Sequence, residues 1–175
     1  MRTSRTWWNE TKASPELLRA WLRDQFRGES TAGPRVDALR DAYAAPGSRA
    51  WRILTVIADQ ERKHARWVGE LLAARGEPLT LDPVQERYWP AVTAMVDDLA
   101  TGAAVGAHAE KMRLARIEAI VADDEAPADI RRVFTKILPD ERFHERAFRR
   151  LAGEAALART AAAHDRGQAL LGLAP

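Results

Sequence analysis

The sequence of 175 residues contains no cysteine. Without thiols the protein can form no disulfide, no thiolate zinc site, no cysteine-ligated iron–sulfur cluster and no cysteine nucleophile. Long apolar runs are also missing, because no uninterrupted stretch approaches the ~20 residues that a membrane-spanning helix needs. The start of the chain likewise lacks the apolar core of a signal peptide. From these absences we expect a cytoplasmic protein with no membrane partner.

A large excess of one charge sign is absent too. Lys and Arg total 27 and Asp and Glu total 25, which gives a net charge of +2 with neutral histidines. Most arginines alternate with acidic residues along helical faces, a pattern that is typical of a solvated surface. The slight basic excess is therefore only weak evidence for a nucleic-acid partner.

Strand alternation, low-complexity tracts and glycine-rich phosphate loops are not found either. The composition leans toward Ala, Leu and Arg, which favour helix, and lacks the β-branched enrichment of strands. Apolar residues at helical spacing predict four long helices, over about 15–44, 48–75, 91–122 and from 127 onward. Two short turns and one long crossover between the second and third helices predict an all-α fold, a four-helix bundle.

Capping and turn residues mark where these helices begin and end. Ser14 and Ser48 are of the residue types that cap helix N-termini, and Gly76 is a typical C-terminal stop. Residues 76–90 contain three prolines and form the crossover, with a short helical turn expected around 84–88.

We divide the chain into an irregular lead-in at 1–14, the bundle at 15–153 and a helical extension at 154–175. The extension either lengthens the fourth helix or forms a fifth. Pro34 and Pro139 either bend their helices or mark segment boundaries.

The motif Glu-x-x-His occurs twice, at Glu61–His64 and at Glu141–His144. Residues three apart lie on the same face of a helix, so each pair can offer a carboxylate oxygen and a ring nitrogen to one point. Apolar residues at helical spacing flank both pairs, which favours a buried site over exposed Glu–His pairs on a surface.

Two single glutamates lie at heights that match these motifs. Glu29 is about 17 residues before the proline–glycine turn and Glu61 about 15 after it, so at ~1.5 Å per residue they face each other across a hairpin. Glu110 and Glu141 are each about 15 residues from the turn at 123–127. Two such hairpins packed face to face would bring four carboxylates and two imidazoles together.

Four unpaired carboxylates inside a core would be prohibitively costly. Two divalent metal ions would balance the four charges, and each ion would gain one nitrogen ligand. Ligation rich in carboxylate suits iron, with manganese as the alternative, better than structural zinc. The predicted metal ligands are Glu29, Glu61, His64, Glu110, Glu141 and His144.

This set resembles the ligands of the ferritin-like di-iron carboxylate proteins, in which two helices each give one Glu and two others each give Glu-x-x-His. The resemblance covers about residues 15–150, fills every ligand position and implies a ferritin-like bundle with two iron ions. Oxygen-activating members often carry Asp before the last Glu, so the resemblance implies that Asp140 orients His64 by a hydrogen bond. Gln60 holds the equivalent place in the first motif. A helix cap after Pro139 is the alternative role for Asp140.

The chain departs from rubrerythrins that carry their own rubredoxin domain. It has no cysteine, and position 113, where these proteins usually have an extra Glu on the third helix, is Arg. Residues 106–111, GAHAEK, also resemble the third helix of di-iron tRNA hydroxylases over a short stretch. His108, His164 and Glu118 are expected to be packing or surface residues, with substitute ligation as the alternative for Glu118.

The resemblance implies a small di-iron oxidase or oxygenase that uses O2 or peroxide to hydroxylate, desaturate or N-oxygenate a small organic substrate. The N-terminal segment, the first helix and the crossover are expected to shape its pocket. Electrons would come from an external donor, and a homodimer is compatible with the sequence. The alternatives are a ferroxidase or iron-binding protein without an organic substrate, a tRNA-hydroxylase-like enzyme, and a metal-free helical interaction module.

Overall fold

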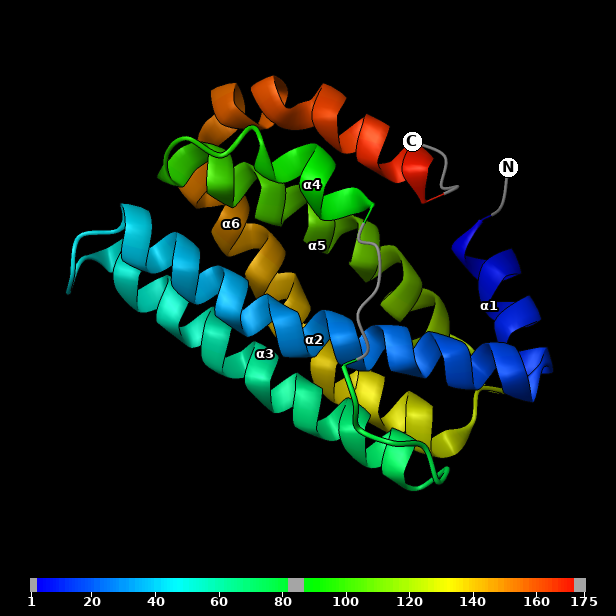
Figure 1. Cartoon of the computed structure of the whole chain (residues 1–175). Helices are drawn as coiled ribbons and strands as arrows, with labels where there is room; N and C mark the ends of the chain where they lie inside the picture. The colour runs from blue at the N-terminus through cyan, green and yellow to red at the C-terminus, as the bar shows by residue number, and fades with distance from the viewer. Residues whose placement is uncertain (1–2, 82–86, 172–175) are drawn as a thin grey trace.

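The computed structural model describes residues 3–81 and 87–171, and every regular element in this part of the chain is a helix. The predicted all-α fold is confirmed (Figure 1). None of these described helices is long and apolar enough to cross a membrane. Their bounds are α1 Ser4–Ala13, α2 Pro15–Tyr43, α3 Arg49–Ala73, α4 Tyr88–Thr93, α5 Leu99–Val121 and α6 Ala128–Leu170.

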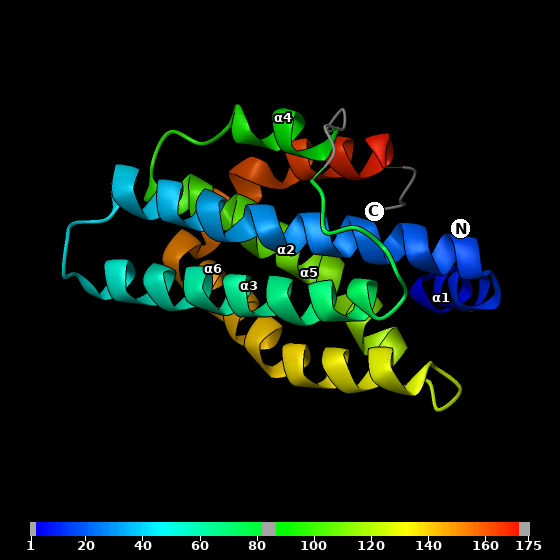
Figure 2. The ribbon, with the colours of Figure 1, turned by 60° about the horizontal axis from the view of Figure 1, so that its bottom comes forward.

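The four long helices form two hairpins, as in a ferritin-like bundle. α2 packs along α3, and α5 packs along the first part of α6 (Figures 1 and 2). The hairpins face each other through contacts of α3 with α6 and of α2 with α5. Each hairpin has a short turn, and the long crossover joins α3 to the second hairpin, as the sequence predicts.

Local sequence sets the ends of the first hairpin's helices. The Oγ of Ser14 accepts a hydrogen bond from the N–H of Leu17 at 3.3 Å, and the Oγ of Ser48 accepts one from the N–H of Trp51 at 3.1 Å. Beyond α3, Gly76 has a φ of +70°, a backbone conformation that residues with a Cβ rarely adopt. The three predicted boundary signals are therefore confirmed.

The prediction of an irregular segment at 1–14 is wrong, because most of it forms α1. Thr3 caps this helix through its side chain. Trp8 is only 1% exposed, and its Nε1 donates a hydrogen bond to Asp123 at 2.7 Å. A short polar segment of this kind gains its helical stability from tertiary packing, which the local pattern does not reveal.

The third long helix begins later than predicted. The helix expected at 91–122 is divided into the short α4 and the long α5. Helix α5 begins after Asp98, which forms a capping box with Thr101. The Oδ1 of Asp98 accepts a hydrogen bond from the N–H of Thr101 at 2.7 Å, and the Thr101 hydroxyl oxygen accepts one from the N–H of Asp98 at 3.2 Å. The helical turn expected at 84–88 falls largely outside the described residues.

Proline ends neither of the helices that contain it. α2 continues through Pro34, and α6 continues through Pro139. The break in α6 is at Gly153, whose φ of 70° and ψ of 165° are not helical. The segment after it turns back and packs against α4, where a Cβ added to Gly167 would lie 2.7 Å from the ring of Tyr88 (Figure 1). The C-terminal segment is thus a separate helical arm and not a straight continuation.

A polar layer lies between two apolar clusters of the bundle. One cluster contains Leu22 and Phe134, and the other contains Leu54 and Phe148. On α6 the buried Glu141 lies midway between the two phenylalanines. The same order recurs along the other three long helices, so each of them delivers one buried glutamate to the same level.

Candidate metal centre

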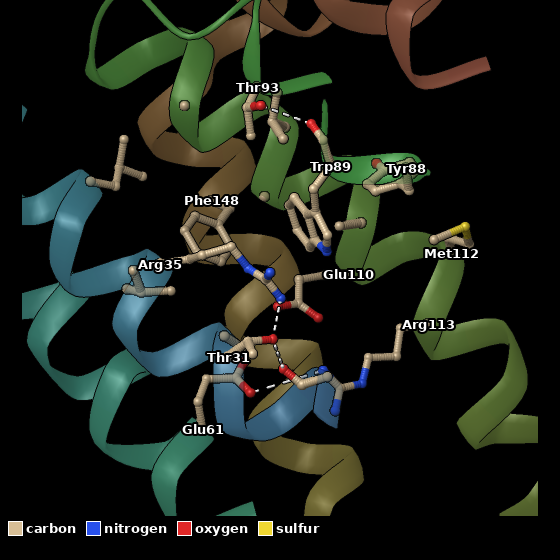
Figure 3. Close-up of a pocket in the computed structure, with 18 of the residues that line it drawn as sticks. Thr31, Arg35, Glu61, Tyr88, Trp89, Thr93, Glu110, Met112, Arg113 and Phe148 are labelled. Atoms are coloured by element: carbon tan, nitrogen blue, oxygen red, sulfur yellow. Dashed lines mark hydrogen bonds and ion pairs between the residues drawn. The ribbon is translucent and has the colours of Figure 1, made fainter. Parts of the chain in front are cut away.

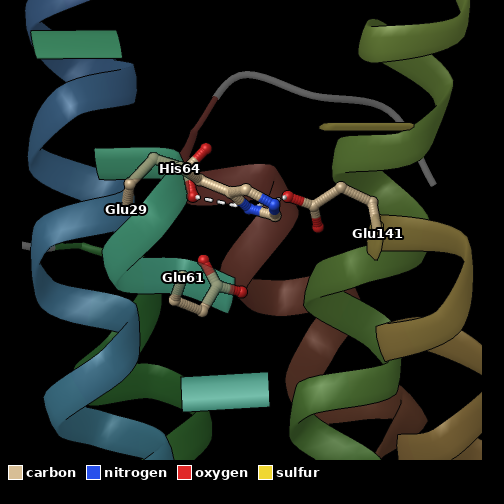
Figure 4. A group of neighbouring side chains, drawn as sticks. All are labelled: Glu29, Glu61, His64 and Glu141. Carbon is tan, nitrogen blue, oxygen red and sulfur yellow. Dashed lines mark ion pairs between the residues drawn. The ribbon is translucent and has the colours of Figure 1, made fainter. Parts of the chain in front are cut away.

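The six predicted ligand residues meet in this polar layer. They form two groups whose ligand atoms lie within 4.8 Å of one another. Figure 4 shows the first group, which α2, α3 and α6 contribute. The first group is Glu29, Glu61, His64 and Glu141, and the second is Glu61, Glu110, Glu141 and His144.

Two carboxylates, Glu61 and Glu141, belong to both groups. The first group adds a Glu from α2 and a His from α3, and the second adds a Glu from α5 and a His from α6. Each group therefore contains one single Glu, one His and two shared carboxylates. This is the arrangement expected when two cations share a pair of bridging carboxylates, and it matches the hairpin heights read from the sequence.

All six side chains are buried. Five of them have 0% exposure and Glu110 has 7%. Both carboxylate oxygens of Glu29, Glu61 and Glu141 lack a hydrogen-bond partner among the described residues. Buried carboxylates without partners are strongly destabilising unless a cation or a proton neutralises them.

A chain of hydrogen bonds fixes the two histidine rings. His64 Nε2 lies 3.1 Å from Asp140 Oδ2, and the amide nitrogen of Gln60 donates to Asp140 Oδ1 at 2.8 Å. The amide oxygen of Gln60 lies 3.0 Å from Nε2 of His144. Asp140 also accepts from Lys63 at 2.7 Å. The contact inferred between Asp140 and His64 is present, and since Asp140 lies inside α6, it caps no helix there.

This chain also determines which nitrogen of each ring faces the carboxylates. A carboxylate only accepts, so the NH2 of Gln60 must face Asp140 and its oxygen must face His144. Both histidines therefore carry a proton on Nε2, and Nδ1 is the atom directed at the centre. His64 Nδ1 lies 3.3 Å from Glu141 Oε1, and His144 Nδ1 lies 3.2 Å from Glu61 Oε1. In each histidine, Nδ1 faces a buried carboxylate, and a metal ion fits between the two groups. Nε2 of the same ring is held by a hydrogen bond, which fixes the orientation of the ring.

The ionisation of the carboxyl groups is uneven. Burial raises the pKa of Glu110 well above its usual value, and the charge of Glu141 adds to the effect. Burial also raises the pKa of Glu61. In Glu141 the positive charge of Arg113 and the two adjacent histidines outweigh the effect of burial and hold its pKa well below the usual range. Metal ligands must be deprotonated, so metal binding at this set would release protons.

Arg113 is part of the centre, although the sequence marked it only as a departure from rubrerythrins. Its guanidinium forms an ion pair with Glu29 and lies 3.5 Å from Glu141 Oε1 and 3.9 Å from Glu61 Oε2. The feature of the sequence that indicates this role is the position of Arg113, one helical turn after Glu110. The guanidinium places one positive charge beside three of the four carboxylates of the centre.

A family model described as Rubrerythrin matches residues 21–152. The chain belongs to the rubrerythrin family. This is a ferritin-like di-iron carboxylate family that binds iron, so the resemblance read from the ligand pattern is confirmed. The 175 residues contain no cysteine and therefore no rubredoxin-type iron site. No curated protein and no solved structure matches the chain significantly.

Beside the centre of this rubrerythrin-family chain lies a pocket with a volume of about 830 Å³ (Figure 3). We call it the apolar pocket; α2, α4 and α5 line it, together with Phe148 and the end of α6. Glu61 and Glu110 are part of its lining, so it reaches the metal-ligand layer. The size falls within the range of roughly 300–1,000 Å³ that is common for small-molecule sites. No described residue of α1 lines the pocket, so the contribution expected from the N-terminal segment is absent there.

The Gly- and Ala-rich middle of α5 forms one wall of the apolar pocket. A Cβ added to Gly106 would lie 3.0 Å from the ring of Phe148. An aromatic ring of α6 therefore packs directly against the glycine at this position.

The remaining polar candidates have packing or surface roles. The rings of His108 and His164 stack at 4.7 Å, and Nδ1 of His164 lies 2.8 Å from the hydroxyl of Tyr88. These contacts join the C-terminal arm to α4 and α5. Glu118 pairs with Arg142 at 2.8 Å on the surface. His108, His164 and Glu118 belong to neither ligand group.

Proposed function

We propose that the protein is a non-haem di-iron oxidase or oxygenase that uses O2 or peroxide to oxidise a small organic substrate. The observation that carries this proposal is the apolar pocket, because its lining includes Glu61 and Glu110. A substrate bound there would lie beside the ligand layer.

The six buried residues would hold two iron ions, which when bound supply the redox chemistry with O2 or peroxide. Glu61 and Glu141 would bridge the ions, since both belong to the two ligand groups. His64 and His144 would each offer Nδ1, with the proton kept on Nε2 by Asp140 and by Gln60. The apolar clusters on either side would exclude water from the reacting groups. Manganese remains the alternative metal.

The electron balance requires a partner. Insertion of one oxygen atom from O2 converts the other to water and needs two electrons and two protons besides those of the substrate. An external electron donor would supply them, whereas peroxide already contains the two electrons.

A ferroxidase without organic substrate fits the pocket less well. An iron path needs acidic residues, but apart from the ligands of the centre the charged residues that line the pocket are five arginines and one aspartate.

The tRNA-hydroxylase alternative is based on residues 106–111, and packing accounts for two of them. Gly106 accommodates Phe148, and Nε2 of His108 lies 3.1 Å from the hydroxyl of Thr160.

The test is anaerobic loading with Fe(II), measurement of bound iron, and exposure to O2 with optical and Mössbauer spectroscopy. We expect about two iron ions per chain and, after O2, a magnetically coupled pair of ferric ions. Iron that is only mononuclear, or less than one ion per chain after loading, would remove the paired-site mechanism.

A further inference from the structure

Resting on the proposed function, which requires an external electron donor, we propose that an acidic electron-transfer protein docks where α3 and α6 meet at the surface. The docking surface is a second pocket with a volume of about 580 Å³, which we call the arginine pocket. Its lining comes from the start of α3 and the middle of α6 and consists of Arg49, Ala50, Ile53, Phe143, Arg146, Ala147, Arg150 and Leu151.

The charge of the arginine pocket favours an acidic partner. The charged residues of its lining are Arg49, Arg146 and Arg150, and all three are exposed. Within residues 3–81 and 87–171 none of their side chains forms an ion pair or a hydrogen bond. Glu145, which precedes Arg146 in the sequence, pairs instead with Arg149 at 3.2 Å. Three uncompensated cations would repel a second copy of the same surface and would attract an acidic protein.

The floor of the arginine pocket is apolar, which favours a protein partner over a small anion. Ile53, Phe143 and Leu151 are half-buried in this floor. Val56, one helical turn beyond Ile53 on α3, is 46% exposed. An apolar centre that contains an aromatic residue and is surrounded by arginines is typical of protein–protein interfaces. A small hydrophilic anion would contact the arginines and leave the apolar floor uncovered.

The arginine pocket also lies close to the metal centre. The ring centroids of Phe143 and His144 are 6.1 Å apart, in an edge-to-face arrangement. His144 is a predicted ligand whose Nδ1 lies 3.2 Å from Glu61 Oε1. One side chain therefore separates the floor of the pocket from a ligand ring.

This position suits electron transfer, because electron tunnelling slows steeply with distance. Two one-electron donors, oxidised in turn, would supply the two electrons that return two ferric ions to the ferrous state. The apolar pocket, which α2, α4 and α5 line for the most part, would stay free for the substrate.

The experiment uses an acidic plant-type 2Fe–2S ferredoxin, a one-electron donor, as the probe. Calorimetry measures the binding of oxidised ferredoxin to the iron-loaded protein at low and high salt. We expect the affinity to fall as salt is added, because exposed charges are screened. The triple variant Arg49→Gln, Arg146→Gln and Arg150→Gln should bind at least about tenfold more weakly than the native protein at low salt.

The matched control removes the same charge from exposed arginines outside the arginine pocket. It combines Arg5→Gln, Arg66→Gln and Arg166→Gln. Its affinity should stay within about twofold of the native value, because dispersed distant charges are screened. Stopped-flow spectroscopy with reduced ferredoxin should show reduction of the ferric ions at a rate that saturates with ferredoxin concentration.

The place of docking can be read directly, because the chain contains no cysteine and a single introduced thiol can carry a fluorescent label. A label on Val56→Cys should be quenched by the cluster of the bound ferredoxin. A label on Leu17→Cys is the control, since Leu17 is on α2 and is 51% exposed. It should keep its fluorescence.

Equal affinities of the two triple variants, an affinity that salt does not change, or equal quenching of the two labels would overturn the assignment. Binding without reduction in samples with about two iron ions per chain would overturn the role of the partner as electron donor. A single-stranded RNA that binds more tightly than ferredoxin, and loses affinity in the arginine-pocket variant, would also overturn it in favour of a nucleic-acid surface. Iron content is measured on the same samples. A low iron content counts against the proposed function, whereas binding and quenching still decide whether the ferredoxin docks.

Discussion

The amide nitrogen of Gln60 lies 2.8 Å from Asp140 Oδ1, and this hydrogen bond joins the histidines of both Glu-x-x-His motifs in one chain. The two residues occupy the same place before the Glu of each motif, yet one is an amide and the other a carboxylate. This difference makes the hydrogen bond possible. Two carboxylates at this distance would repel each other, whereas an amide can donate to a carboxylate and accept from a histidine. Gln60 and Asp140 are therefore a complementary hydrogen-bonding pair.

The first prediction concerns Gln60→Leu. The substitution leaves Nε2 of His144 without its acceptor, so we expect the ring to lose its fixed orientation and metal affinity to fall about 10- to 100-fold. Chelator competition with Fe(II) under argon measures the affinity. Gln168→Leu on the C-terminal arm serves as the control and should leave the affinity unchanged; an unaltered affinity in Gln60→Leu would show that the hydrogen-bond chain does not orient the ligand.

The second prediction concerns Arg113→Met. In the metal-free protein this change removes the cation that contacts Glu29 and Glu141, and loss of one partner from a buried ion pair costs about 3–5 kcal/mol. The same cation competes with a metal ion for these carboxylates, so metal affinity should rise. Thermal unfolding of metal-free samples and chelator competition measure the two effects.

The control for Arg113→Met is Arg142→Met. Arg142 pairs with Glu118 on the surface, and an exposed pair of this kind contributes only about 0–1 kcal/mol. Equal destabilisation by the two substitutions, or weaker metal binding in Arg113→Met, would contradict the role of Arg113 as a counter-charge of the centre.

The third prediction compares Trp8→Ala with Trp7→Ala. Trp8 is 1% exposed and bonds to Asp123, whereas its neighbour is only partly buried. Truncation of a large buried aromatic residue costs about 3–5 kcal/mol, so Trp8→Ala should lower the free energy of unfolding by that amount and Trp7→Ala by clearly less. Urea unfolding measures both. Similar small losses would mean that α1 does not pack on the bundle as described.

Some features of the fold and of the metal centre can be predicted from the sequence, and others cannot. The meeting of Glu29 with Glu61 was predictable because helical rise is constant and the turn is marked by proline and glycine. α1 was not predictable, because its stability depends on a contact between Trp8 and Asp123, which are 115 residues apart. The role of Arg113 and the apolar pocket were also out of reach, since both depend on which way side chains point across neighbouring helices.

The fourth prediction is a pH dependence at Asp123. Hydrogen bonds from Lys12 and Trp8 outweigh burial and hold the pKa of this carboxyl below its usual value. A carboxyl whose pKa is lower in the folded state stabilises the protein above its unfolded pKa, and the contribution is lost as pH falls through the folded pKa. The stability difference between the native protein and Asp123→Asn should therefore be constant above about pH 5 and shrink as the pH falls below the unfolded pKa of about 3.9 and through the lower folded pKa. Urea unfolding at several pH values measures it, and a constant difference would exclude the linkage.

The fifth prediction uses the sharing of ligands between the two groups. Glu61 belongs to both groups and Glu29 to only one, so the two substitutions to Ala should differ in stoichiometry and not only in affinity. Glu61→Ala removes a carboxylate from both positions and should bind well under one iron ion per chain, whereas Glu29→Ala should retain about one. Metal analysis after anaerobic loading gives the counts, and circular dichroism confirms that both variants are folded. Equal iron contents in the two variants would mean that Glu61 does not bridge two ions, even if both residues bind metal, because a bridging ligand is the only one whose loss must weaken both positions at once.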